Sequence, residues 1–401
     1  MIPINNYKNY LDRHKKNLRY LLLLSLITFV LLFVWASLAH AYDYRKLIEI
    51  HNSQVSGSSD LDDFPVLVSI QNDSDLQAGV TNANGYDITF RAFDGTTVLD
   101  HEIEKWDGST GTLVAWVRLP TVYIGTDTKF YIYYGDSSVS TPTENPSGVW
   151  DSNYKGVWHL NEQSTGAAGE FKDSTSNNNH GEGGGVSGGS LPQQWSAKIG
   201  YGQYFHESTD IIAMGDTSSL DINGTAITLE AWVRYSDNPN TDWDGVLSKE
   251  GYSTGYRMMI DDDGDVGAVE FQLDSEAGYD VDTATNASAG TWHHLVSTYD
   301  GTKMKVYIDG VKDANEDSKT NSIEVNSSSF VIGHGSDDVG EWWSYPFRGT
   351  IDEVRVSNTA RSAGWIATSY TNHNTPDVFY RVNSEVYIGG GNQPPTVEAG
   401  S

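Results

Sequence analysis

Residues 291–310 read TWHHLVSTYDGTKMKVYIDG, and this stretch carries the pattern that decides the fold. Turn-forming residues stand at 299–303, YDGTK, and again at 308–312, IDGVK. Asp-Gly pairs of this kind favour tight turns between antiparallel strands. Because the two turns bracket a short strand-like run, they predict a regular ladder of β-hairpins.

Residues 227–235, ITLEAWVRY, show the alternation of a strand with one buried face. Apolar Ile227, Leu229, Ala231 and Val233 alternate with Thr228, Glu230, Trp232 and Arg234. Similar short runs recur between turn signals, and residues 362–372 predict a helix with Ser362 as its N-cap. This spacing predicts an all-β protein with two β-sandwich domains in tandem.

The composition of the chain limits the chemistry it can perform. Of its 401 residues, 38% are hydrophobic and 12% aromatic, which is enough for packed cores in more than one domain. It has no cysteine, so disulfides, thiolate metal sites and a cysteine nucleophile are excluded. The net charge of −29 disfavours nucleic acid and anionic lipid as partners and attracts cations.

The N-terminus carries a targeting signal. Basic residues precede an apolar run from Tyr20 to Ala39, which ends in the small-x-small pattern Ala39-His40-Ala41. We expect residues 1–41 to be a signal peptide cleaved after Ala41, and the alternative is an uncleaved membrane anchor. In both cases we expect the rest of the chain to be exported, to the cell surface or beyond it.

A segment of altered composition divides the exported part. Residues 137–148 contain two prolines and are interpreted as a linker. The linker separates a small β-sandwich domain at residues 42–136 from a larger one at residues 149–390. The last residues form a Gly- and Pro-rich stretch, and 391–401 is interpreted as a linker and the start of a further repeat.

A polar loop at residues 173–182, DSTSNNNHGE, offers many oxygen ligands and little to bury. It does not fit the EF-hand pattern, since Asn178 stands where that loop needs glycine and Gly184 where it needs glutamate. Another kind of hard-metal loop would need a second carboxylate from elsewhere in the chain. A solvated polar loop is the other interpretation that these residues allow.

Five stretches of the larger domain follow one another in a characteristic order: GVWHLNE (156–162), DSTSNNNHGE (173–182), ITLEAWVR (227–234), the hairpin stretch at 291–310 and FRGTIDEVRVSNTARS (347–362). In these stretches the larger domain resembles the LamG-like jellyroll of the concanavalin A-like lectin/glucanase superfamily. The resemblance implies that the polar loop and the Asp of G-x-I-D-E-V meet at one structural Ca²⁺, with Asp173, Asn178 and Asp352 as ligands.

The smaller domain resembles a domain of unknown function that often precedes such modules in exported bacterial and archaeal proteins. The stretches DLDDFPVLVSI, GTLVAWVRLP and KFYIYYGD carry this resemblance, which implies no activity of its own. The final QPPTVEAGS is similar to the start of a polycystic-kidney-disease-type β-sandwich repeat.

Aromatic residues on loops are the candidates for ligand binding, because sugar rings stack on aromatic faces. They are Trp243, Trp342, Trp343 and Tyr345. The acidic loop at residues 333–346 carries three of them, and a lid packed over the sandwich edge is the alternative for that loop.

The motifs of known enzyme classes are missing from the sequence. No glucanase E-x-D-x-x-E motif occurs, and the acid stripe Asp100, Glu102 and Glu104 is interpreted as the wet face of a strand. The adjacent His293 and His294 point to opposite faces of a strand, which predicts that they do not share a metal.

The sequence therefore predicts a non-catalytic recognition protein that binds a surface glycan or polysaccharide. One alternative is an adhesive spacer that pairs with surface proteins, and another is a polysaccharide-degrading enzyme. We expect no nucleic-acid partner, and contact with a membrane only through residues 1–41 if they remain.

Overall fold

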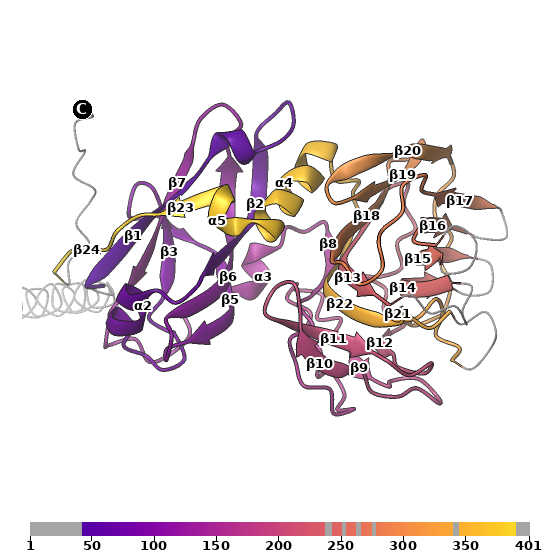
Figure 1. The fold of residues 1–401 in the computed structure, drawn as a ribbon, viewed down its shortest axis with the longest axis horizontal. Helices are drawn as coiled ribbons and strands as arrows, with labels where there is room; N and C mark the ends of the chain where they lie inside the picture. The colour runs from indigo at the N-terminus through magenta and orange to yellow at the C-terminus, as the bar shows by residue number, and fades with distance from the viewer. Residues whose placement is uncertain are drawn as a thin grey trace, which may run out of the picture.

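The computed structural model describes residues 42–236, 243–250, 254–261, 266–274, 278–339 and 345–389. The predicted signal peptide or anchor at residues 1–41 and the predicted further repeat at residues 391–401 lie outside these ranges. Within the ranges, no helix is long and apolar enough to cross a membrane. Strands dominate the described chain, which confirms the prediction of an all-β protein (Figure 1).

The first sandwich is built mainly from the N-terminal part of the chain, drawn in indigo and purple in Figure 1. Among the described residues it has a six-stranded sheet, ordered β23-β1-β7-β3-β4 with β24 also paired to β1, and a three-stranded sheet, ordered β2-β6-β5. In β2, Phe64, Val66 and Val68 point into the core between the sheets, while Leu67 points to the outer side. The elements are β1 (Tyr44–Ile50), β2 (Leu61–Ile70), α2 (Ser74–Gly79), β3 (Thr89–Ala92), β4 (Val98–Leu99), β5 (His101–Asp107), β6 (Thr112–Val122) and β7 (Thr128–Tyr134).

The C-terminal residues return to this first sandwich. The helices α4 (Ala363–Asn374) and α5 (Pro376–Phe379) lie beside β2 and lead into β23 (Tyr380–Val382) and β24 (Val386–Tyr387), which pair antiparallel with β1. The sequence pattern predicted residues 149–390, which include these elements, as one second domain. Their strand pairing places them with the first, because Phe379 and Tyr380 are buried in its core.

The second sandwich holds the hairpin ladder. Among the described residues its eight-stranded sheet is ordered β10-β11-β22-β13-β18-β19-β20 with β8 on β22, and its seven-stranded sheet is ordered β17-β16-β15-β14-β21-β12-β9. The elements are α3 (Pro146–Val149), β8 (Tyr154–Trp158), β9 (Glu182–Gly183), β10 (Gln193–Ser196), β11 (Tyr201–Phe205), β12 (Ile212–Gly215), β13 (Ile227–Tyr235), β14 (Trp243–Glu250), β15 (Gly255–Asp261), β16 (Val269–Leu273), β17 (Tyr279–Asp282), β18 (His293–Tyr299), β19 (Lys303–Ile308), β20 (Val311–Ser318), β21 (Phe330–Ile332) and β22 (Gly349–Ser357).

The two predicted turns connect β18, β19 and β20 in order, which confirms the hairpins. Asp309 and Gly310 both have positive φ angles, 51° and 77°, as a tight turn between twisted strands requires. The alternation in β13 is confirmed as well, because Ile227, Leu229 and Val233 lie in the core. Its opposite face is also buried, which the alternation alone does not predict.

The two sandwiches pack against each other through outer sheet faces. The outer face of the three-stranded sheet meets the outer face of the eight-stranded sheet, and α4 lies between the two bodies (Figure 1). An apolar cluster crosses this contact and includes Leu67 and Trp116 from the first sandwich with Val157 from the second. The predicted linker lies along the first sandwich, since Asn145 N donates to His101 O at 2.9 Å.

Candidate functional site

Two of the predicted ligand-binding aromatics meet at the seven-stranded sheet, and Trp342 and Trp343 lie outside the described residues. Trp243 begins β14, where it pairs with Asp261 of β15. Tyr345 accepts a hydrogen bond at its carbonyl from Gly245 N, at 2.9 Å, so its backbone lies beside β14 as well. Both side chains are partly exposed. The structure therefore gathers Trp243 and Tyr345 at one corner of this sheet.

Polar side chains extend from this corner over the outer face of the sheet. Arg257 lies with its guanidinium carbon 5.4 Å from the centre of the Tyr345 ring, and its Nε lies 2.9 Å from Glu250 Oε2. On the neighbouring strand, Gln272 Nε2 donates to Glu270 Oε1 at 3.0 Å. These residues were not predicted as candidates for ligand binding, although the alternation of apolar and polar residues in β15 and β16 indicates that they face outward. Apolar residues of β15 and β16 fill the core, so Arg257, Glu270 and Gln272 must face outward.

Glu270 has an unusual environment for a carboxyl group. Burial raises its pKa to about 8, against the opposing influence of the nearby Arg257 guanidinium, and Asp282 and Asp280 raise it further. A protonated carboxyl can donate one hydrogen bond and accept others. This outer face therefore offers planar donors and acceptors beside aromatic rings, which suits a ligand rich in hydroxyl groups.

The residues predicted to bind calcium have hydrogen-bond partners within the protein. Asp173 is buried, and its carboxylate already accepts four hydrogen bonds: from Val157 N at 3.1 Å, Thr175 N at 2.9 Å, Thr175 Oγ1 at 2.9 Å and Asn179 N at 2.8 Å. The Asn178 side chain donates to Ser176 O at 2.9 Å and is exposed. Asp352 is fully buried and accepts from Ile199 N at 2.8 Å. The oxygens of Asp173 are occupied, so these residues do not fit the implied site, and calcium binding stays a prediction.

The interpretation of Asp100, Glu102 and Glu104 as a wet strand face is wrong for the two glutamates, whose side chains are 12% and 1% exposed, while Asp100 precedes β5 and is partly exposed. Glu102 and Glu104 do share one side of the strand, but that side faces the second sandwich. The Glu104 side chain is 1% exposed. Trp116 Nε1 donates to Glu104 Oε2 at 3.0 Å, and Trp150 Nε1 donates to Glu102 Oε2 at 3.1 Å. The stripe therefore belongs to the contact between the sandwiches.

His159 follows β8 and lies among three carboxylates. Its Nδ1 is 2.8 Å from Glu353 Oε1 and 3.8 Å from Glu104 Oε2, and its Nε2 is 3.3 Å from Glu102 Oε2. The imidazole ring stacks on Trp116 with 5.6 Å between ring centres. Burial opposes the charged imidazolium, but Glu353 and Glu102 raise the pKa of His159 well above its usual value.

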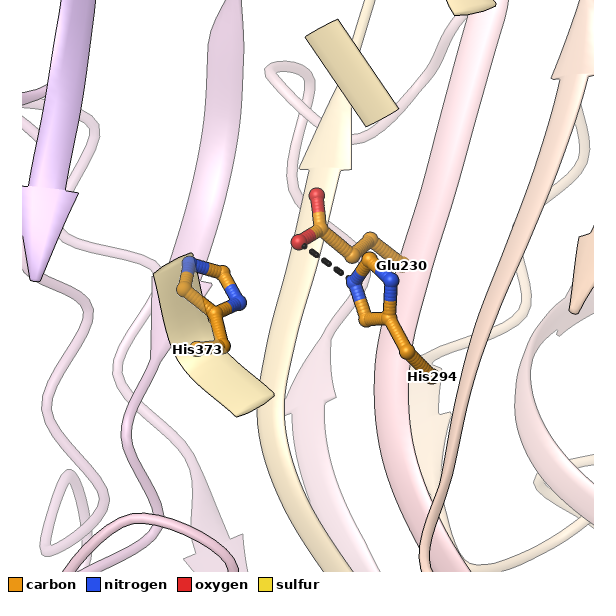
Figure 2. A group of neighbouring side chains, drawn as sticks. All are labelled: Glu230, His294 and His373. Carbon is orange, nitrogen blue, oxygen red and sulfur yellow. Dashed lines mark hydrogen bonds and ion pairs between the residues drawn. The ribbon is translucent and has the colours of Figure 1, made fainter. Parts of the chain in front are cut away.

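A second buried group lies on the same interface and is shown in Figure 2. His294 Nε2 lies 3.0 Å from Glu230 Oε1, and His373 of α4 faces the pair. Arg355 donates to Glu230 Oε1 at 3.2 Å and to Glu353 Oε2 at 2.7 Å, so it links this group to His159 and its carboxylates. Burial and the nearby Arg355 charge hold the pKa of His373 well below its usual value. His293 points to the other side of β18 and pairs with Asp309 at 2.8 Å, as the strand alternation predicts.

Comparison with known proteins confirms the two family resemblances. Residues 207–367 match the family described as the concanavalin A-like lectin/glucanases superfamily, and residues 84–167 match a domain of unknown function (DUF2341). No curated protein matches the sequence.

Several solved structures are similar to the chain. Domain 4 of AbnA, an extracellular arabinanase of Geobacillus stearothermophilus solved with arabinotriose, is 21% identical with a TM-score of 0.43, covering 55% of this chain and 98% of that one. The binding domain of Paraclostridial Mosquitocidal Protein 1 is 14% identical with a TM-score of 0.41, covering 54% of this chain and 52% of that one. The receptor binding domain of botulinum neurotoxin D is 13% identical with a TM-score of 0.39, with shares of 54% and 52%. The chain thus spans about half the length of the two toxin domains.

The sheets, the hairpins and the family matches lead to one assignment: residues 207–367 form a concanavalin A-like domain, and a domain of unknown function at residues 84–167 precedes it.

Proposed function

We propose that the protein is an exported, non-catalytic recognition protein that binds a glycan or polysaccharide at the corner formed by Trp243, Tyr345 and Arg257. The observation that carries the proposal is the placement of Arg257, which lies over the Tyr345 ring and is held by Glu250. Aromatic faces bind the apolar C–H side of a sugar ring, and a fixed guanidinium can donate two parallel hydrogen bonds to neighbouring hydroxyls. Export is inferred from residues 1–41 of the sequence.

A polysaccharide-degrading enzyme is the second candidate, and Glu270 favours it. A carboxyl group that keeps its proton near neutral pH is what a general acid requires. Hydrolysis would also need a second carboxylate as a nucleophile, and Glu250 lies nearby. Its ion pair with Arg257 restrains it from this role, which argues against an enzyme. We therefore favour binding over hydrolysis.

A glycan array tests the proposal directly. We expect the purified protein to bind a defined set of polysaccharides, and Tyr345→Ala, Trp342→Ala or Trp343→Ala to weaken binding by about tenfold, because one lost stacking contact costs roughly 1.4 kcal/mol. Trp195→Ala is the matched control, since Trp195 is an exposed tryptophan on β10 of the other sheet. Silence from the folded protein on every glycan would favour the protein-binding spacer. Release of reducing sugar that Glu270→Gln abolishes would establish the enzyme.

A further inference from the structure

We propose that Glu104, His159 and Glu353 form a binding site for a divalent transition metal that joins the two sandwiches. Each residue offers one ligand atom, and these atoms lie within 4.8 Å of one another. In a tetrahedral zinc site, bonds of about 2.0–2.1 Å place ligand atoms roughly 3.3 Å apart. His159 Nδ1 and Glu353 Oε1 are already 2.8 Å apart, so a modest movement of Glu104 completes the set.

The surroundings orient the proposed ligands as they do in established metal sites. A ligating imidazole usually donates its other ring nitrogen to a carboxylate, which fixes its tautomer. Glu102 lies on that side of the ring, with Oε2 3.3 Å from His159 Nε2, but the two atoms make no hydrogen bond in the described structure. Ser174 Oγ fixes Glu102 in turn, by donating to Oε1 at 2.6 Å. Trp116 stacks on the imidazole and donates to Glu104, so two of the three ligands have a defined orientation.

Two buried oxygen atoms point to a missing partner. Glu104 Oε1 and Asp352 Oδ1 are buried without a hydrogen-bond partner among the described residues. A buried carboxylate oxygen without a partner is costly, and coordination to a cation removes that cost. The chain also approaches Glu104 Oε1 closely, since a Cβ added to Gly200 would lie 2.9 Å from it.

Carboxyl groups outnumber cationic side chains around the site. Glu102, Glu104 and Glu353 surround His159, and Arg355 pairs with Glu353 among the described residues. The combination of imidazole and carboxylate ligands suits Zn²⁺, Mn²⁺ or Fe²⁺ better than Ca²⁺, which prefers oxygen ligands only.

The group in Figure 2 makes a weaker metal site, although its three ligand atoms also converge. Arg355 already neutralises Glu230. Each group contains a histidine with one unpartnered ring nitrogen among the described residues, so this feature does not separate them. The group around His159 differs because it contains a buried carboxylate oxygen, Glu104 Oε1, that has no hydrogen-bond partner there.

A cavity lies near the proposed site. A cavity of about 340 Å³ opens between the sandwiches, and its lining includes Lys105, Ile199, Gly200 and His373. Gly200 lies next to the unpartnered oxygen of Glu104, and Ile199 donates to Asp352. The ligands come from β5, from the residue after β8 and from β22, so a bound metal would connect the first sandwich to the second.

The test is metal binding by the purified protein, stripped with a chelator and then titrated with Zn²⁺ alone. Zn²⁺ is added both to the folded protein and during refolding, because the site is buried. We expect about one Zn²⁺ per chain by elemental analysis, a raised Tm and no comparable effect of Ca²⁺. Glu104→Gln and His159→Gln should abolish stoichiometric binding, and Glu102→Gln should weaken it by about 10–100-fold.

His206→Gln serves as the matched control, since His206 is a partly exposed histidine whose pair with Asp210 lies away from the interface. Co²⁺ gives a second measurement, because its visible absorption reports nitrogen and oxygen coordination even if a variant is less stable. The proposal is overturned if the wild-type protein takes up no stoichiometric Zn²⁺, Mn²⁺ or Fe²⁺. Equal uptake by Glu104→Gln, His159→Gln and the control overturns it as well. Glycan binding is measured separately and does not enter this result.

Discussion

At the scale of single residues, Asp173 shows how one buried carboxylate organises a polar loop. Its four accepted hydrogen bonds tie the loop to β8 and to its own backbone. Asn177 and Asn179 add hydrogen bonds to Tyr154 O and Lys155 O. The asparagines therefore replace backbone pairing in a segment that is too short for a regular strand.

We expect Asp173→Ala to lower the free energy of unfolding by about 2–4 kcal/mol, because it leaves buried N–H groups without an acceptor. The loss should be equal in Ca²⁺ and in EDTA, as measured by urea unfolding. Asn178→Gly is the control, since its exposed side chain lies in the same loop and glycine tolerates its φ of 56°. A loss of stability confined to the Ca²⁺ sample would instead support the calcium site.

Glu270 provides a prediction of pH dependence. Its folded pKa of about 8 lies above the unfolded value, so the folded state holds a proton that the unfolded state releases as the pH rises. The free energy of unfolding should therefore fall as the pH rises from about 4.5 to 8. The total loss is at most roughly 1.4 kcal/mol for each unit by which the folded and unfolded pKa values differ. Glu270→Gln should flatten the dependence of Tm on pH in this window. Identical profiles for the two proteins would contradict the prediction.

At the scale of elements, the sequence predicted the position of α4 in the chain but not the strand against which it packs. Ser362 Oγ accepts a hydrogen bond from Trp365 N at 3.2 Å, so the local N-cap signal was correct. Local signals also gave the turns between β18, β19 and β20, because a turn depends on its own residues. The partner of α4 depends on residues some 300 positions away, such as Leu67. A single sequence carries no signal for that pairing.

Asn372 of α4 provides an element-scale test. Its Oδ1 accepts from Leu67 N at 2.8 Å and its Nδ2 donates to Leu67 O at 3.0 Å, so one side chain satisfies both backbone groups of a buried strand residue. Asn372→Ala should lower the free energy of unfolding by about 2–4 kcal/mol, since both groups lose their partner. Thr371→Ala is the control, because its hydroxyl bonds only within the helix. Hydrogen exchange at the Leu67 amide should accelerate only in the first variant.

At the scale of the whole molecule, the contact between the two sandwiches is the feature that could not be predicted from the sequence. Glu102, Glu104, Glu230 and Arg355 alternate with core residues in their strands, and charged residues in such positions normally face water. Here they face the opposite sandwich, where Glu102 lies beside His159 and Arg355 pairs with Glu230 and Glu353. Asp352, one of the calcium ligands that the family resemblance implies, also lies near this contact, beside Glu104 and Glu353.

This contact should make the two sandwiches unfold together. We expect one transition in calorimetry for the wild-type protein, because the interface contains a buried apolar cluster and buried ion pairs. Arg355→Met should lower stability by about 3–5 kcal/mol, since it leaves Glu230 and Glu353 uncompensated, and should separate the transition into two. Arg234→Met on the same sheet, where Arg234 only covers Trp292, is the matched control. A single unshifted transition in Arg355→Met would contradict this view.

The pairing of β24 with β1 has a mechanical consequence. Ile388 N donates to Asp43 O at 2.8 Å, so the two ends of the described chain leave the protein side by side. Tension applied through these ends would break the backbone pairs Tyr44–Tyr387 and Arg45–Val386 one after another, in an unzipping geometry and not in a shearing geometry. Neither sandwich core would bear the force until these pairs had opened. In optical tweezers the first extension should come from peeling β24 and β23 off β1, at low force, before either core unfolds.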